Sequence, residues 1–159
     1  MSLLDKEPVK RVEKALKQFN QTLEIIILKD GARTAKDAAK ILSCEVGAII
    51  KSLVFRTEDN FILCLVSGDK KCSLNKLKVI IGKKDVSMAT PEQVKTQTGF
   101  TIGGVSPIGH VNSIEVIIDN KLERFKGLFA AAGHPNCVFK INFENIQKIT
   151  NGKTKNITE

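Results

Sequence analysis

A lysine in the middle of an apolar segment is the residue whose type and position most suggest chemistry. Lys51 lies in residues 48–56, where the alternation of a β-strand places it on one face with Ile49, Leu53 and Phe55. The opposite face is also largely apolar, so the strand is predicted to be central and its lysine buried. A buried ammonium is costly unless it meets an anionic group, although a lysine can also extend its head to water. Lys51 is therefore a candidate for binding an anionic ligand.

A glycine-rich segment at residues 103–110, Gly-Gly-Val-Ser-Pro-Ile-Gly-His, is the second candidate. Gly103, Gly104 and Gly109 allow the backbone to approach a ligand closely and leave N–H groups free to bind oxygens. The segment lacks the Gly-Lys-Ser/Thr that ends a phosphate-binding P-loop, which excludes that class of site. A tight connection between a helix and a strand has a similar composition, so both interpretations stay open.

The histidines and cysteines give no metal or redox motif. His110 and His134 lie in loops rich in Gly and Pro, and no two of the four cysteines form a Cys-x-x-Cys pair. We therefore expect no metal and no cofactor, and we interpret the cysteines as reduced thiols of a cytoplasmic protein. The first 19 residues carry eight charged side chains, and no run approaches the roughly 18 apolar residues of a membrane helix. Neither a secretory signal nor a membrane partner is predicted.

The chain is basic, and its lysines are unevenly distributed. It has 25 Lys and Arg against 17 Asp and Glu, a formal net charge of +8. Six lysines and no acid lie between Asp69 and Asp85, which is the pattern of a phosphate-binding surface. A solvated, lysine-rich helix face gives the same pattern. This stretch contains no aromatic residue, which argues against a platform for stacking single-stranded bases.

The elements that must position these residues follow from length and patterning. A length of 159 residues indicates one domain with a substantial core, spanning residues 1–159, and excludes a multidomain enzyme. Apolar spacing and caps predict helices over residues 8–19, 35–42, 74–81, 90–99 and 143–149. Apolar and β-branched runs predict strands over residues 23–28, 48–56, 61–67, 86–89, 115–119, 128–132 and 138–141. Residues 151–159 are polar and are predicted to be a flexible tail. The irregular order of these helices and strands along the chain favours an α/β domain with a mixed sheet over a doubly wound parallel fold.

Four segments together resemble the YbaK/ProX family of trans-editing aminoacyl-tRNA deacylases, which is related to the editing insertion domain of bacterial prolyl-tRNA synthetases. They are Thr-Ala-Lys-Asp-Ala-Ala at 34–39, Val-Gly-Ala-Ile-Ile-Lys-Ser-Leu-Val-Phe at 46–55, Leu-Val-Ser-Gly-Asp-Lys-Lys at 65–71 and Thr-Gly-Phe-Thr-Ile-Gly-Gly-Val-Ser-Pro-Ile-Gly-His at 98–110. The resemblance spans residues 9–150 in order. It implies a mixed, barrel-like β-sheet surrounded by helices, and hydrolysis of the ester that joins a wrong amino acid to tRNA.

The resemblance also implies roles for individual residues. Lys51 matches the family's essential lysine, and Gly103 and Pro107 match its Gly-x-x-x-Pro motif, so we expect Lys51, Gly103 and Gly104 to be catalytic. The residues that we expect to bind the aminoacyl group are Ile49, Leu53, Ile102, Val105, Ser106, Pro107, His110, Gly133 and His134. The residues that we expect to bind the tRNA acceptor stem are Lys70, Lys71, Lys76 and Lys78.

The resemblance leaves the substrate and the partners open. The segment Ala-Ala-Ala-Gly at residues 130–133 lacks the serine that members acting on cysteinyl-tRNA tend to carry there, so Cys, Ala, Ser and Thr are all candidate amino acids. The expected partner is mischarged tRNA, with an aminoacyl-tRNA synthetase as a second candidate, and the protein is expected to be a monomer or a homodimer. One alternative is a non-catalytic module that binds tRNA or a synthetase. Another is an enzyme for cysteinyl-tRNA alone, in which the substrate's thiol attacks its own ester.

Overall fold

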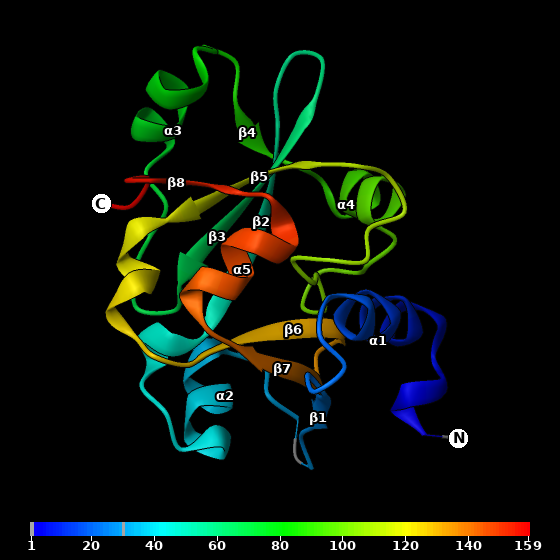
Figure 1. The fold of residues 1–159 in the computed structure, drawn as a ribbon. Helices are drawn as coiled ribbons and strands as arrows, with labels where there is room; N and C mark the ends of the chain where they lie inside the picture. Colours follow the sequence, from blue (N-terminus) through cyan, green and yellow to red (C-terminus); the bar gives the residue numbers. More distant parts are fainter. Residues whose placement is uncertain (1, 30) are drawn as a thin grey trace.

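The hairpin predicted between residues 48 and 67 forms the centre of the larger of two sheets. The structure is a computed structural model, which describes residues 2–29 and 31–159. β2 (Ile50–Arg56) and β3 (Phe61–Ser67) are antiparallel, and the short β4 (Ser87–Met88) pairs with the far end of β2. β5 (Glu115–Asp119) runs parallel to β3, and β8 (Lys153–Lys155) runs parallel to β5. The order β4-β2-β3-β5-β8 confirms the prediction of a mixed sheet (Figure 1).

The smaller sheet contains three antiparallel strands in the order β1-β7-β6. They are β1 (Ile25–Ile27), β6 (Leu128–His134) and β7 (Cys137–Ile141). A single parallel bridge between Ile49 and Phe129 joins this sheet to the start of β2. The single α/β domain is confirmed, but the expected barrel-like closure is wrong, because the two sheets stay separate and meet at this one bridge.

The part of the chain that the structure describes contains five α-helices, which lie close to their predicted positions. They are α1 (Glu7–Phe19), α2 (Ala35–Leu42), α3 (Leu74–Ile81), α4 (Pro91–Thr98) and α5 (Phe143–Thr150). Local chemistry explains their starts: the Thr90 hydroxyl and the Gln93 side chain form a reciprocal capping box at α4, and the Thr34 hydroxyl caps α2. Short 3₁₀ helices also occur at η1 (Leu3–Asp5), η2 (Val46–Ala48) and η3 (Asn120–Arg124). No helix in the described residues is long and apolar enough to cross a membrane.

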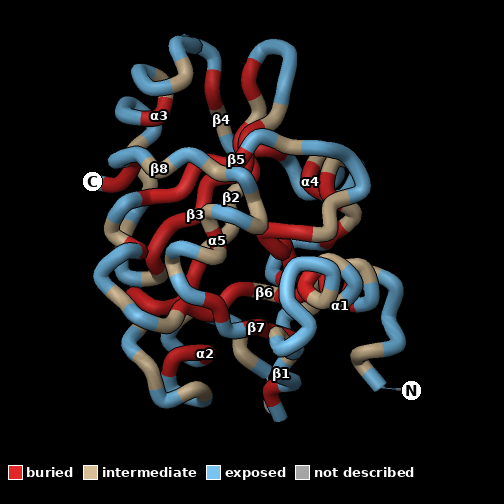
Figure 2. The backbone as a smooth tube through the Cα atoms, viewed as in Figure 1, coloured by how far each residue is buried: buried red, intermediate tan, exposed pale blue. Residues whose placement is uncertain are grey.

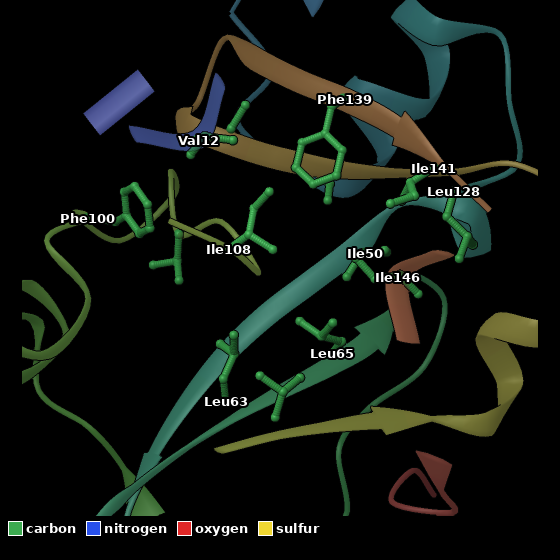
Figure 3. Close-up of a cluster of buried hydrophobic side chains, with 14 of the residues drawn as sticks. Val12, Ile50, Leu63, Leu65, Phe100, Ile108, Leu128, Phe139, Ile141 and Ile146 are labelled. Atoms are coloured by element: carbon green, nitrogen blue, oxygen red, sulfur yellow. The ribbon is translucent and has the colours of Figure 1, made fainter. Parts of the chain in front are cut away.

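The main core fills the space between the two sheets. Figure 3 shows Ile50 and Leu65 from the larger sheet facing Phe139 and Leu128 from the smaller one, with Phe100 closing one end. The alternate residues of β3 face away from this core and pack in a second cluster under α3. Burial on both faces makes β3 the most enclosed strand of the larger sheet, as the burial colours of Figure 2 show. The hairpin that carries Lys51 is therefore rigidly supported.

The C-terminal segment differs from its prediction as a flexible tail. β8 pairs with β5, and Ile157 and Thr158 are completely buried. The buried carboxylate of Asp119 accepts a hydrogen bond from the Ile157 N–H at 2.9 Å and another from the Thr158 hydroxyl at 3.1 Å. The polar sequence of this segment predicts a tail because the shared partner, Asp119, lies 38 residues before Ile157 and 39 before Thr158. The expectation was wrong because a distant buried acid satisfies polar groups that the segment itself cannot pair.

Candidate functional site

A cavity of about 330 Å³ lies where the start of β2 meets α2, β6 and the loop that follows α4. Most of its walls are apolar, and the small side chains of Ala38, Ala130 and Ala131 project only a short distance into the cavity. Among the described residues, its polar side chains are Arg33, Thr34, Lys51 and Ser52, and no carboxylate lines it. The cavity is therefore suited to a small ligand that combines an apolar group with a negatively charged or electron-rich one.

The cavity brings together six of the residues predicted from the sequence. They are Ile49, Lys51, Leu53, Ile102, Gly103 and Val105. The two groups come from segments about 50 residues apart, one on β2 and the preceding bridge position, the other on the loop after α4. The fold thus places the mid-strand lysine and part of the glycine-rich loop around one space.

Lys51 is half-buried, and its ammonium donates a hydrogen bond to the backbone carbonyl of Lys70. Among the described residues, no carboxylate forms an ion pair with Lys51, so its charge is held in place but not neutralised. The turn that presents the Lys70 carbonyl is fixed by Asp69, whose carboxylate accepts two hydrogen bonds from Arg124 at 2.8 and 3.1 Å. Hydrogen bonding from Arg124 is also the main cause that lowers the pKa of Asp69. Lys51 is thereby a positioned positive charge beside an apolar cavity.

The two adjacent glycines of the loop have different surroundings. Gly103 lines the cavity and has φ +96°, a left-handed conformation that favours glycine. Gly104 is buried outside the lining, and its N–H donates to the carbonyl of Thr101 at 3.0 Å. A side chain at Gly104 would come within 3.0 Å of the backbone of His134, so this glycine lets the loop pack against β6. The backbone of Gly103 is the part of the pair that a ligand in the cavity can reach.

The C-terminal part of the glycine-rich loop faces another cavity. Pro107 and His110 line a space of about 620 Å³ between the loop, α1 and α5. His110 Nε2 donates to the carbonyl of Ser106 at 2.7 Å, and its ring meets the edge of Phe100 at a centroid distance of 5.8 Å. Burial of the ring lowers the pKa of His110. The structure therefore separates Ser106, Pro107 and His110 from the cavity of Lys51, and their substrate-binding roles stay predictions.

Gly133 and His134, at the end of β6, also lie outside the cavity lining, although their neighbours Ala131 and Pro135 are part of it. The His134 Nδ1 accepts a hydrogen bond from the backbone N–H of Asn136 at 3.0 Å, which shapes the β6–β7 turn. Gly133 has φ +91°, and a side chain there would meet the backbone of Pro8 at 2.8 Å. In this structure both residues organise the turn and its packing against α1.

The four predicted tRNA-binding lysines lie on the segment between β3 and the end of α3. Lys71 and Lys76 are exposed, and Lys70 and Lys78 are partly so. The ammonium of Lys76 donates to the carbonyl of Thr158 at 2.7 Å, which gives this lysine a structural partner. Lys70 immediately precedes the exposed Lys71 and supplies the carbonyl that holds Lys51, so the start of this basic segment lies next to the cavity. A tRNA-binding role for the four stays a prediction.

Sequence reasoning missed most of the wall opposite β2. Phe129, Ala130, Ala131 and Val138 line the cavity from the smaller sheet. Their apolar strand pattern is that of core residues, and no local signal distinguishes a strand that borders a cavity from one that borders only the core. Ser52 was also missed, although it lines the cavity and directly follows Lys51.

Comparisons with known proteins agree with this geometry. The family model of the aminoacyl-tRNA editing domain matches residues 29–149. The protein YwhH of Bacillus subtilis is 32% identical over 146 residues, which cover 91% of this chain and 92% of YwhH. The proline–tRNA ligase of Brachyspira hyodysenteriae is 32% identical over 121 residues, but these cover only 21% of the ligase. A crystal structure described as a candidate trans-editing enzyme for prolyl-tRNA synthetase superposes with a TM-score of 0.92 at 35% identity, covering 97% of this chain and 98% of that one. With its cavity, its lysine and its matched residues, the chain belongs to the aminoacyl-tRNA editing domain family.

Proposed function

We propose that this protein hydrolyses the ester bond of a mischarged aminoacyl-tRNA in trans, with a small amino acid such as Cys, Ala, Ser or Thr as the group removed. The observation that carries the proposal is the positioned ammonium of Lys51 beside a mostly apolar cavity of about 330 Å³, in a chain of the editing-domain family. The apolar wall would hold the amino acid, and the charged side would face the tRNA end.

The reaction needs little from the protein besides positioning. An aminoacyl ester is already activated, so a bound water can attack it without a protein nucleophile when the geometry is held and the developing charge is stabilised. Lys51 would contact the phosphate of the terminal adenosine or the ester oxygen. The exposed backbone of Gly103 would orient the attacking water, and the free ribose hydroxyl of the tRNA would assist proton transfer.

The cavity would select the amino acid by size. The small side chains of Ala38, Ala130 and Ala131 leave the space that the side chain of the amino acid would occupy. The buried side chains of Ile49 and Val105 form walls that limit this space. Such a pocket discriminates by roughly 1–3 kcal/mol per methylene, which is enough to favour one small amino acid over a larger one but not to exclude close isosteres. A narrow range of small substrates is expected.

The test is a panel of tRNAs charged with Ala, Ser, Thr, Cys or Pro, with release of the labelled amino acid measured over time. We expect turnover by the wild type and a loss of about 10²-fold or more in Lys51→Ala, because a charge at the reaction centre is removed. Lys153→Ala, which changes an exposed lysine of β8, is the matched control and should retain wild-type turnover.

Three outcomes would contradict the proposal. Full activity in a folded Lys51→Ala protein would remove Lys51 from the mechanism. Binding of tRNA without release of any amino acid would favour a non-catalytic binding module on this fold. Release of cysteine alone, abolished when serine replaces cysteine on the same tRNA, would favour attack by the substrate's own thiol over attack by water.

A further inference from the structure

The edge of β2 that faces the cavity is unpaired over its middle. On that edge, Ile49 bridges to Phe129 at one end, and Phe55 pairs with Met88 of β4 at the other. Among the described residues, no strand pairs with this edge of β2 between those two points. Ser52 lies in this gap and lines the cavity.

The direction of the backbone groups in the gap follows from two hydrogen bonds. The carbonyl of Ile49 accepts from the N–H of Gly68, on the β3 side, at 2.7 Å. The carbonyl of Val54 accepts from the N–H of Ala89, on the β4 side, at 3.0 Å. Both backbone groups of one residue point to the same edge, and successive residues alternate. Ser52 is two residues before Val54 in the same strand, so its backbone groups point in the same direction as those of Val54. Its N–H and carbonyl therefore point away from β3, toward the edge that the cavity occupies.

The side chain of Ser52 is also unsatisfied. Among the described residues, two buried side-chain atoms have no hydrogen-bond partner, and they are the hydroxyl oxygens of Ser52 and Ser67. Only Ser52 lines the cavity; Ser67 is completely buried elsewhere in the sheet. A buried hydroxyl without a hydrogen-bond partner costs free energy. Because the hydroxyl of Ser52 lies beside a cavity, its unpaired state indicates that a bound ligand supplies the missing hydrogen-bond partner.

We propose that Ser52 forms the oxyanion site of the deacylation reaction, through its backbone N–H and its hydroxyl. This inference rests on the proposed ester hydrolysis. In the bound state, the hydroxyl would turn about its Cα–Cβ bond toward the cavity that the rest of the residue lines. Both groups would then donate to the carbonyl oxygen of the substrate ester, and the nearby charge of Lys51 would favour a negative oxygen at this place.

The step balances without a cofactor. The oxygen of water forms a bond to the ester carbonyl carbon, and the carbonyl π electrons move to the oxygen that Ser52 stabilises. The tetrahedral intermediate then re-forms the carbonyl and breaks the bond to the ribose oxygen. That oxygen leaves with the electron pair and takes up the proton that the attacking water released. The products are the free amino acid and tRNA with a free terminal hydroxyl.

The decisive variant is Ser52→Ala, with Ser67→Ala as its matched control. Each removes one buried, unpaired hydroxyl, so each protein should keep or raise the wild-type melting temperature. Only Ser52→Ala should lose activity, by about 10²-fold in kcat, which is the usual loss for one oxyanion donor when the backbone donor is left in place. The probe for ground-state binding is the aminoacyl-adenosine amide of the amino acid that the wild type removes fastest, and its affinity should change less than threefold in Ser52→Ala.

Each other result would overturn the inference. Wild-type kcat in Ser52→Ala would remove Ser52 from the reaction while leaving the proposed function intact. A loss of kcat accompanied by an equal loss of affinity for the amide would assign Ser52 to ground-state binding. A melting temperature lowered by several degrees in Ser52→Ala, but not in Ser67→Ala, would assign its hydroxyl to the fold. A wild type without turnover on any charged tRNA would overturn the proposed function and the Ser52 role together.

Discussion

Replacement of Asp119 by alanine should strongly destabilise the fold, because this buried carboxylate anchors the C-terminal segment. Asp119 is completely buried and accepts hydrogen bonds from Ile157 and Thr158, which are also completely buried. Alanine leaves both of these buried donors without an acceptor, at roughly 1–3 kcal/mol each, and also removes the acceptor of the Lys121 N–H. The expected loss is therefore at least about 4 kcal/mol of unfolding free energy. For a domain of this size that corresponds to a melting temperature lower by about 8–16 °C.

Urea denaturation followed by circular dichroism gives the free energy, and a thermal scan gives the melting temperature. Asp119→Asn keeps one acceptor oxygen but loses the charge, so we expect an intermediate loss of about 1–3 kcal/mol. Lys155→Ala, an exposed change on the neighbouring β8, should stay within about 0.5 kcal/mol of the wild type. A loss under about 1 kcal/mol in Asp119→Ala would refute the anchoring role, because an anchor of this kind cannot be removed at so small a cost.

Three further predictions concern other parts of the molecule. Gly133→Ala should cost about 2 kcal/mol or more in urea denaturation, because the new side chain combines a positive φ with a 2.8 Å approach to Pro8; a neutral result would contradict this. The double variant Lys71→Gln, Lys78→Gln should weaken tRNA binding and reduce the slope of log K against log salt by about 1.5, whereas an unchanged slope would exclude both from phosphate contact. Because burial lowers the pKa of His110, the unfolded chain binds a proton that the folded one does not, so stability should be full above about pH 6.5 and fall below it. His110→Gln should show a shallower fall between pH 7.5 and 5.5, and an identical pH profile would refute this linkage.

Features set by neighbouring residues could be predicted from the sequence. The capping box of Thr90 and Gln93 and the apolar spacing of α1 are complete within a few residues, so the helices lie close to their predicted bounds. The hairpin of β2 and β3 is similarly local, and it correctly placed Lys51 in a supported strand. Ile49, Lys51 and Leu53, which the sequence assigned to the site, line the cavity, but Ile50 and Ser52 of the opposite face line it too, so strand alternation did not define its lining.

Features set by distant contacts could not be predicted in this way. β8 exists because a buried acid 38 residues earlier accepts the Ile157 N–H, and nothing near Ile157 in the sequence signals that partner. Pro107 and His110 are close to Gly103 in sequence, but the turn after Val105 carries them to another cavity. A motif therefore shows which residues occur together in the chain, whereas the path of the loop decides which of them share a site.

The ordered C-terminal segment also affects the site, because it supports the segment that holds Lys51. Glu159 donates its backbone N–H to the carbonyl of Lys71 at 2.9 Å, next to the Lys70 carbonyl that accepts from Lys51. Cys72 forms an isolated bridge with Thr158, whose hydroxyl binds Asp119. A continuous set of contacts thus runs from the buried acid through the last residues to the carbonyl that orients the ammonium. The four segments that resemble the family contain the lysine but not these last residues, so the position of Lys51 depends on a part of the chain that the motifs do not include.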